Sequence, residues 1–474
     1  MTLLLDVAVA ELAAHDVRAW RSEVHARLER GERLVTLYGR PGEGGAVVVT
    51  AVLEPAPHQL VALRASVDPA HGFHALTEEF RAAHCFEREL HEQHGVRIAG
   101  HPWLKPIRFE GVNAGKMDQY PFYKLDGKEV HEVQVGPIHA GVIEPGAFRF
   151  MCLGEVVHHL EIHLGYQHRG VEKLLLARDP RTLAPLIETI AGDTSVAHAW
   201  AYVAAIEALA GVSVGSGSDV ARGLLLELER VAMHLAGLAG MAADVGFLQG
   251  AAGYGRLRTI AINTSMRLCG SRFGRGALRP GATRVRADVG AEVSASLVQL
   301  AQDVAVVNDC FLSARTVQHR LRDVGTVATA KAAQVGLVGP AARASGVTLD
   351  QRTTIAPTVE PSGDCWARAR VRVGEMDRSL AWMSAALAEL TVPAPAPAAA
   401  LAPSRLVVSL CEGWRGEVVH CLETDERGEL VHYKVQDPSL RNWLGLALAM
   451  RGGEISDFPI CNKSFDLSYC GNDL

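Results

Sequence analysis

Hydrophobic and polar residues alternate differently in the two parts of the chain. After a polar helical start, the runs VVVTAVLE (47–54) and LVALRASVD (60–68) are rich in β-branched residues and predict strands. The helical pattern of EEFRAAHCFERELHEQHG should end at Gly95, because glycine commonly terminates helices. A Pro/Gly-rich passage, 100–111, follows and marks a domain boundary. Residues 1–110 are therefore predicted to form an α+β domain.

The second segment, 111–474, opens with short strands and then becomes mainly helical. The strands VQVG and AFRFMCL flank a loop from Gly136 to Gly146. Beyond about Gly165, apolar residues recur with helical spacing. Amphipathic stretches lie at 219–246, 256–272, 291–322 and 375–390. We expect a large, mainly α domain with small β elements.

Two features follow this helical region. The Pro/Ala-rich segment 392–403 is predicted to be a stiff, exposed connector. After it, EVVHCLET and ELVHYKV flank a turn at Asp425 to Gly428, which predicts a hairpin.

Composition narrows the functional classes. The 474 residues include 47 Lys and Arg against 53 Asp and Glu, so the net charge of −6 gives no electrostatic reason to expect nucleic acid. Asp6, Glu11 and Asp16 interrupt the apolar run that a signal peptide would need, and no uncharged run is long enough to span a membrane. The nine cysteines include no C-x-x-C pair, which indicates reduced thiols in a cytosolic protein.

Several polar clusters are candidates for chemistry, and each has a structural alternative. In HRGVEK, His168, Arg169 and Glu172 are close enough to share protons or to form a surface salt bridge. His139, in the rigid Gly136–Gly146 loop, is either a ligand or a surface residue of a strand connection.

Further candidates lie in the helical region. Glu227, Arg230 and His234 share a helix face, as a titrating group or as a polar stripe between packed helices. His159 and His163 have helical i, i+4 spacing, but Leu160 stands where a zinc-protease motif has Glu. Arginines between 256 and 284 are suited to anionic groups or to a partner's carboxylates.

Eight blocks follow one another along the chain: FERELHEQHGVRIAGHP, VGPIHAGVIEPGAFRF, YQHRGVEKL, ELERVAMHLAGLAGMAADVG, RFGRGALRPG, GLVGPAARASG, VQDPSLRNW and DFPICNKSFDLSYCGNDL. In this order they resemble the 30 kDa-type and 49 kDa-type subunits of complex I fused in one chain. They are also similar to the large subunits of membrane-bound group 4 nickel–iron hydrogenases.

The resemblance implies an assembly as well as a fold. It implies a small partner subunit that carries an iron–sulfur cluster, and antiporter-like membrane subunits on whose cytoplasmic face the chain docks. The chain itself would bind no cofactor alone, while NAD binding, quinone reduction, electron transport and proton translocation would belong to the assembly.

Departures from the family pattern affect the metal site. Nickel in these hydrogenases is held by four cysteines in two C-x-x-C motifs, and the aligned positions here are Ala191, Thr194, Ser468 and Gly471. Cys470 lies next to one ligand position but cannot replace four soft donors. We therefore expect no nickel–iron centre and no hydrogenase activity.

The quinone site of complex I is matched only in part. His139 aligns with the first loop histidine of complex I, but the second falls near Ile143 and Glu144, and the quinone-side tyrosine aligns with Gly192. Quinone therefore remains an open ligand. The alternatives are another acceptor, a cavity that uses Asp193, His198 or Glu144, or a cavity without chemistry.

Two carry-overs concern protons. Arg169 and Glu172 match the R-G-x-E motif whose Glu relays protons in the hydrogenases, so Glu172 is the first candidate for proton transfer. His234 matches a histidine beside the partner's cluster, where reduction would raise its pKa. The resulting hypothesis is a redox-complex subunit that couples electron transfer to proton movement around Glu172, Arg169, His234, His139 and Asp193. The rivals are an active hydrogenase with unusual ligands and a purely structural bridging subunit.

Overall fold

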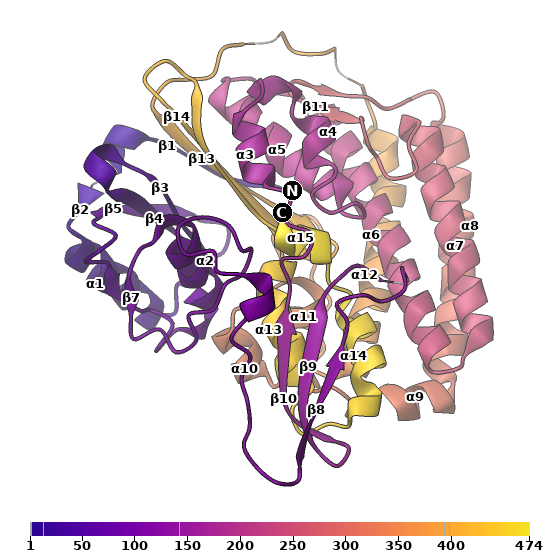
Figure 1. Cartoon of the computed structure of the whole chain (residues 1–474). Helices are drawn as coiled ribbons and strands as arrows, with labels where there is room; N and C mark the ends of the chain where they lie inside the picture. Colours follow the sequence, from indigo (N-terminus) through magenta and orange to yellow (C-terminus); the bar gives the residue numbers. More distant parts are fainter. Residues whose placement is uncertain (1, 13, 142, 393, 398) are drawn as a thin grey trace.

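Two four-stranded sheets lie face to face in the computed structural model (Figure 1). The structure describes every residue except 1, 13, 142, 393 and 398. The N-terminal sheet has the order β2 (Ala14–His15), β5 (Val61–Val67), β4 (Val47–Glu54) and β3 (Arg33–Pro41). Its neighbours pair antiparallel except β2 and β5, which are parallel. The strands predicted at 47–54 and 60–68 are confirmed as β4 and β5.

Helices cover the outer face of this sheet. Trp20 and Val24 of α1 (Val17–Glu29) and Phe86 and Leu90 of α2 (His84–His94) are buried against it. The helix α2 ends at Gly95 as predicted, and φ of +71° there explains the glycine. The short strands β6 (Phe73–His74) and β7 (Ile98–Ala99) pair beside it.

The second sheet unites the two ends of the chain. Its order is β1 (Thr2–Ala8), β13 (Arg405–Gly413), β14 (Gly416–Thr424) and β15 (Leu430–Gln436), all antiparallel. The predicted helical start is therefore wrong for Thr2–Ala8, where alternating apolar residues pair with β13, although α1 follows. The hairpin after the connector is confirmed as β14 and β15.

A third sheet precedes the helical region. Its order is β10 (Val156–His163), β9 (Ala147–Leu153) and β8 (Val130–Val135). His159 and His163 therefore lie on a strand rather than on a helix, so their i, i+4 spacing does not place them on one helical turn. A two-stranded ribbon, β11 (Leu278–Arg279) and β12 (Ala282–Thr283), follows later.

Long helices form the remaining layer, at the right of Figure 1. The stripe predicted after Ser218 belongs to α6, which begins slightly earlier and packs on α7 and α12. The stretch 291–322 is two helices, because Ala314 has an extended backbone between them. The helices are α3 (Val171–Leu176), α4 (Ala184–Ile187), α5 (Ser195–Leu209), α6 (Ser216–Asp244), α7 (Leu248–Cys269), α8 (Gly290–Ser313), α9 (Arg315–Leu321), α10 (Thr329–Gln334), α11 (Gly339–Arg343), α12 (Cys365–Ala386), α13 (Ser439–Ala449), α14 (Phe458–Phe465) and α15 (Tyr469–Asp473).

The core joins these layers. One large apolar cluster combines α5, α6 and α12 with the inner face of the second sheet. The described residues of the predicted connector, apart from 393 and 398, contain no helix or strand. None of the described helices combines the length and the apolarity that crossing a membrane requires.

Candidate functional site

Two segments far apart in sequence meet at Arg169. Its guanidinium donates to the carbonyl oxygens of Thr189 (2.8 Å) and Ile190 (3.0 Å), before α5, and of Cys470 (3.3 Å), in α15. Arg169 thus fastens the loop that contains Ala191 and Thr194 to the segment that contains Ser468 and Gly471. Arg169 therefore has a positioning role between these two segments.

The four positions that the family resemblance aligns with nickel ligands carry small or hydrogen-bonded groups. Ala191 is fully buried. The Thr194 hydroxyl accepts from Arg415 at 3.1 Å, and the Ser468 hydroxyl accepts from the backbone N–H of Gly471 at 2.9 Å, which caps α15. A Cβ at Gly471 would lie 2.6 Å from the carboxyl carbon of Asp437. The carboxyl group of Asp437 therefore occupies the space that a side chain at Gly471 would need.

An ion pair closes one side of this region. The Asp193 carboxylate accepts hydrogen bonds from both terminal nitrogens of Arg415, with 2.7 Å from Nη2 to Oδ2. The Asp193 carbonyl also accepts from the Trp414 indole at 2.9 Å, and the guanidinium lies 3.9 Å from the Trp414 ring centroid. Bidentate pairing and ring stacking fix both side chains.

The Gly136–Gly146 loop borders the same region. His139 Nε2 donates to the carbonyl of Gly146 at 2.8 Å, so the ring folds back onto its own loop. Glu144 accepts from the Cys470 backbone N–H at 3.4 Å. Burial, opposed in part by Ser468, raises the pKa of the Cys470 thiol, so the thiol is protonated at neutral pH. Glu144 therefore contacts the segment that contains Ser468 and Gly471, whereas His139 contacts its own loop.

A chain of titratable side chains leads away from Gly471. His198 Nε2 lies 3.1 Å from Asp437 Oδ2, His198 Nδ1 lies 3.1 Å from His420 Nε2, and His420 Nδ1 lies 2.8 Å from the Tyr433 hydroxyl. All four residues are fully buried. We call Asp437, His198, His420 and Tyr433 the relay.

The relay has one donor direction. Burial favours the neutral carboxyl, but the hydrogen bond from His198 and the charge of Arg415 lower the pKa of Asp437. Burial also lowers the pKa of His420 well below its usual value. With ionised Asp437 as the acceptor at one end, the hydrogen bonds can all run in one direction: Tyr433 donates to His420, His420 donates to His198, and His198 donates to Asp437. Such a uniformly oriented chain can pass a proton along its length.

Glu172 belongs to a different, charged group. Its carboxylate lies 3.0 Å from Lys434 Nζ and accepts from the Val435 backbone N–H at 2.9 Å. Lys434 also contacts Glu89 at 2.6 Å, which in turn pairs with Arg108. Burial would raise the pKa of Glu172, but Lys434 and Arg108 outweigh it and lower the pKa. Glu172 is therefore ionised, and its partner Lys434 links the large domain to Glu89 of the N-terminal domain.

His234 is enclosed by charges. It is fully buried, its Nε2 lies 2.8 Å from Glu375 and its Nδ1 lies 3.3 Å from Arg372. Desolvation lowers the pKa of His234 to about 4, despite the nearby Glu375. The neutral ring therefore donates to Glu375 and accepts from Arg372.

The buried carboxylates and guanidinium groups around His234 are equal in number. Arg230, Arg343 and Arg352 are each paired with carboxylates, and Arg343 donates to Glu375 and Glu412, both at 2.8 Å, whereas Arg372 donates to the carbonyls of Ser464 and Phe465. We call this set the ion cluster: Glu227, Arg230, Arg343, Asp350, Arg352, Arg372, Glu375 and Glu412.

One carboxyl beside the cavity gave no signal in the sequence. Glu229 accepts from the backbone N–H groups of Val196 (2.7 Å) and Ala197 (3.4 Å) at the start of α5. Burial raises the pKa of Glu229 to about 8, and the nearby charge of Asp193 adds to the shift. Glu229 therefore holds a proton at neutral pH, next to the loop that carries Asp193.

Two family profiles match this chain. Residues 14–124 match the 30 kDa subunit of respiratory-chain NADH dehydrogenase, and residues 244–402 match its 49 kDa subunit. The chain belongs to the complex I family, as a fusion of the 30 kDa-type and 49 kDa-type domains.

Individual relatives come from two branches of this family. The alpha subunit of the membrane-bound hydrogenase of Pyrococcus furiosus is 28% identical over 71% of this chain and 85% of its own length. An NADH-quinone oxidoreductase subunit of Dehalococcoides mccartyi is 29% identical over 71% of this chain and 96% of its own length. The fold matches a chain of the solved membrane-bound sulfane sulfur reductase, an archaeal respiratory membrane complex. That match has a TM-score of 0.67 and 21% identity, and it covers 74% of this chain and all of the other.

A nickel centre of the hydrogenase branch does not fit these residues. Such a centre needs deprotonated thiolates, whereas Ala191 offers no donor, Ser468 is a helix cap and Asp437 fills the space beside Gly471. The neighbouring thiol, Cys470, is protonated. The residues present favour hydrogen-bonding and proton chemistry over coordination of a soft metal.

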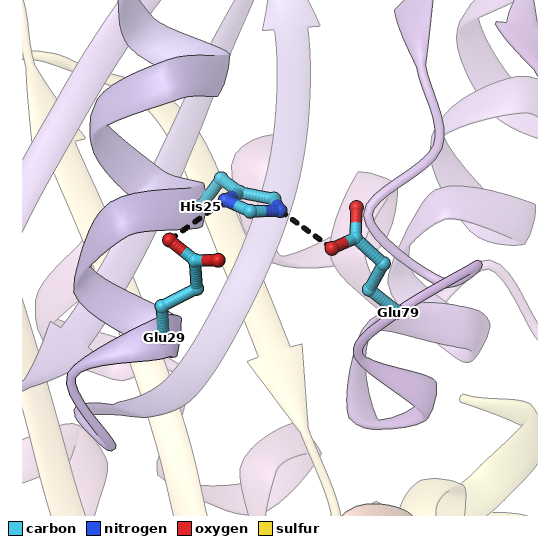
Figure 2. A group of neighbouring side chains, drawn as sticks. All are labelled: His25, Glu29 and Glu79. Atoms are coloured by element: carbon cyan, nitrogen blue, oxygen red, sulfur yellow. Dashed lines mark hydrogen bonds and ion pairs between the residues drawn. The ribbon is translucent and has the colours of Figure 1, made fainter.

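Among the residues that the structure describes, one group of three potential metal ligands lies close together, and it is in the 30 kDa-type domain. Figure 2 shows His25 between Glu29 and Glu79, with a dashed line from each ring nitrogen to a carboxylate. The distances are 3.5 Å from Nδ1 to Glu29 and 2.8 Å from Nε2 to Glu79. Both nitrogens already have carboxylate partners, so the arrangement is an exposed ion-pair triad.

Proposed function

We propose that this complex I-family chain is a subunit of a membrane-bound redox complex and couples electron transfer to proton movement at a metal-free polar cavity. Its relatives include membrane-bound hydrogenase and NADH-quinone oxidoreductase subunits, which supports membership of such a complex. The electron donor is the iron–sulfur cluster of a small partner subunit. The chain docks on the inner face of the membrane, against membrane subunits that move the ion.

One observation carries this proposal: the relay starts beside Gly471, a position that the family resemblance aligns with a nickel ligand. Asp437 lies against Gly471 and accepts from His198, and two further buried groups continue the chain to Tyr433. A carboxylate with a hydrogen-bonded path behind it suits proton exchange, because its proton affinity responds to any charge that arrives nearby.

The chemistry follows from charge balance. An electron that arrives near the cavity adds one negative charge, which raises the proton affinity of Asp437. His198 then gives its proton to Asp437, His420 gives its proton to His198, and Tyr433 gives its proton to His420. One proton enters at the Tyr433 end to replace the last one, and Asp437 becomes protonated. Glu229 offers a second proton store beside Asp193. Arg169 and Arg415 hold the two segments in place while the charge changes.

Asp437→Asn tests the proposal in the assembled complex. Asparagine keeps the size of Asp437 but cannot take up the proton, so we expect turnover and ion transport to fall by about 100-fold, a typical effect of losing an acid–base group. Asp288→Asn is the matched control, because Asp288 is exposed and paired with Arg286 at the surface. Equal activity of both variants would support a purely structural bridging subunit.

A second experiment addresses the metal. Elemental analysis of the purified complex should find no nickel assigned to this chain. About one nickel per chain would contradict the metal-free cavity. It would mean that donors other than the four cysteines of the family hold the metal.

A further inference from the structure

A cavity lies between the two domains, and none of the relay residues lines it. Its volume is about 540 Å³, and its walls come from α2, from the passage after β7, and from β10, α10 and α13. These elements meet in the lower centre of Figure 1. The volume is in the range of small-molecule sites, which often lie at domain interfaces.

The lining is strongly cationic. Among its described residues Glu161 is the single carboxylate, and Glu161 is paired with Lys105. Other cations of the lining have uncharged partners, since Arg88 donates to backbone carbonyls and Lys331 to Gln334. The cations of the lining are Arg81, Arg88, Lys105, Lys331 and Arg451. A ligand with negative charge would therefore be attracted to this cavity.

Polar atoms deep in the cavity lack partners. His84 is 5% exposed, and among the described residues neither of its ring nitrogens has a hydrogen-bond partner. Within the same described part of the chain, the Nη1 atom of Arg81 is also buried without a partner. Burial and the charge of Arg88 lower the pKa of His84 well below its usual value, so its ring is neutral and offers one donor and one acceptor. Buried polar groups are nearly always hydrogen-bonded, so these atoms indicate a missing polar ligand.

Aromatic rings line the same space. Trp103 lies 5.6 Å from the His84 ring and 5.3 Å from the Arg81 guanidinium. Tyr120, Tyr123 and Trp443 complete the aromatic part of the lining. The exposed Lys331 and Arg451 stand at the opening. The cavity thus combines aromatic rings and buried hydrogen-bonding groups with exposed cations.

We propose that this interdomain cavity binds a nucleoside phosphate, with the base beside Trp103 and His84 and the phosphates at Lys331 and Arg451. A planar base supplies both donors and acceptors for His84, and it can stack on aromatic rings. A phosphate supplies the charge that the entrance lacks. A phospholipid headgroup would satisfy the entrance but would leave His84 and Arg81 without partners.

Binding to the purified full-length chain tests this inference. Calorimetric titration with ADP should give saturable binding with one site per chain. Arg451→Ala should weaken it by about tenfold, because a charge-assisted hydrogen bond is lost. Arg315→Ala is the matched control, since Arg315 is exposed and distant from the lining. His84→Phe, which keeps the ring, should weaken adenosine and ADP to the same degree.

The other outcomes would overturn the proposal. Equal binding of inorganic phosphate and ADP, with none of adenosine, would identify a simple anion site. Binding of phosphatidylglycerol vesicles in place of ADP would identify a membrane contact. Absence of ADP binding, or an equal loss in Arg451→Ala and Arg315→Ala, would remove the site altogether. None of these results bears on the relay.

Discussion

The histidines His198 and His234 are both fully buried, but their surroundings differ. His198 stands between one carboxylate and a neutral imidazole, and its hydrogen bonds continue to Tyr433. His234 stands between a carboxylate and a guanidinium in the ion cluster, where opposite charges compensate one another. The relay can change its protonation state by moving protons along one path, whereas the ion cluster is held by charges that must all remain paired.

This contrast separates stability from function. Removing one member of a buried ion cluster leaves a charge without a partner, which is costly. Removing a neutral member of the relay should lower the free energy of unfolding by about the contribution of one hydrogen bond, and it should stop proton movement along the relay. His234, the histidine that the family resemblance matches, is thus placed among charged groups and outside the relay, and its predicted role in cluster-coupled proton uptake stays a prediction.

The largest expected effect is on the ion cluster. Glu375→Gln should lower the free energy of unfolding by about 3–5 kcal/mol, because Arg343 loses a charged partner in the interior. Urea unfolding of the purified chain measures this. Asp288→Asn, at an exposed ion pair, should leave the free energy of unfolding nearly unchanged. Similar values for the two variants would show that the cluster does not stabilise the fold.

The next effect concerns the protonated carboxyl beside the cavity. The pKa of Glu229 is about 8 in the folded chain and 4.5 without the fold, so the folded state binds more protons between these values. The stability from Glu229 is full below about pH 4.5 and is lost as the pH rises through 8. Between pH 6 and 8 the loss is roughly 2–3 kcal/mol.

Glu229→Gln tests that dependence. Glutamine imitates the protonated carboxyl and does not titrate. The slope of the unfolding free energy against pH should therefore fall by the equivalent of about one proton, and the variant should be more stable than the parent at pH 8. Urea unfolding at pH 6 and pH 8 gives both values. An unchanged pH slope would mean that Glu229 is ionised in the folded chain.

The smallest effect on stability belongs to the relay. Tyr433→Phe removes one buried hydroxyl and should cost about 1–2 kcal/mol, since His420 loses a hydrogen-bond partner. In the assembled complex the same variant should nevertheless slow ion transport, because the far end of the relay is missing. A variant with the expected stability and full transport would place the proton entry elsewhere.

Local patterns predicted much of the fold. The β-branched runs became β4 and β5, and the helix that ends at Gly95 did so because glycine accepts a positive φ. The pairing of Thr2–Ala8 with β13 was missed, since its partner strand lies about 400 residues away and no local signal names it. The eight family blocks in order predicted the domain composition, which the family profiles support.

The site was predictable only in part. Arg169 lies in one of the family blocks, YQHRGVEKL, and its contacts to Ile190 and Cys470 join the two segments that the resemblance aligns with nickel ligands. By contrast, Asp437 and His420 were not among the candidates from the sequence, because the relay joins residues that lie 222 and 239 positions apart in the chain. Asp437 lies in VQDPSLRNW, one of the blocks, so its charge inside a family block was the signal that could have identified it.

Proton uptake on reduction tests the central claim most directly. Reducing the assembled complex in a weakly buffered solution with a pH indicator should take up about one proton per electron at the cavity, because the added charge raises the proton affinity of the relay. Asp437→Asn should lower this uptake to near zero while the partner's cluster is still reduced. Equal uptake by the parent and by Asp437→Asn would contradict the account.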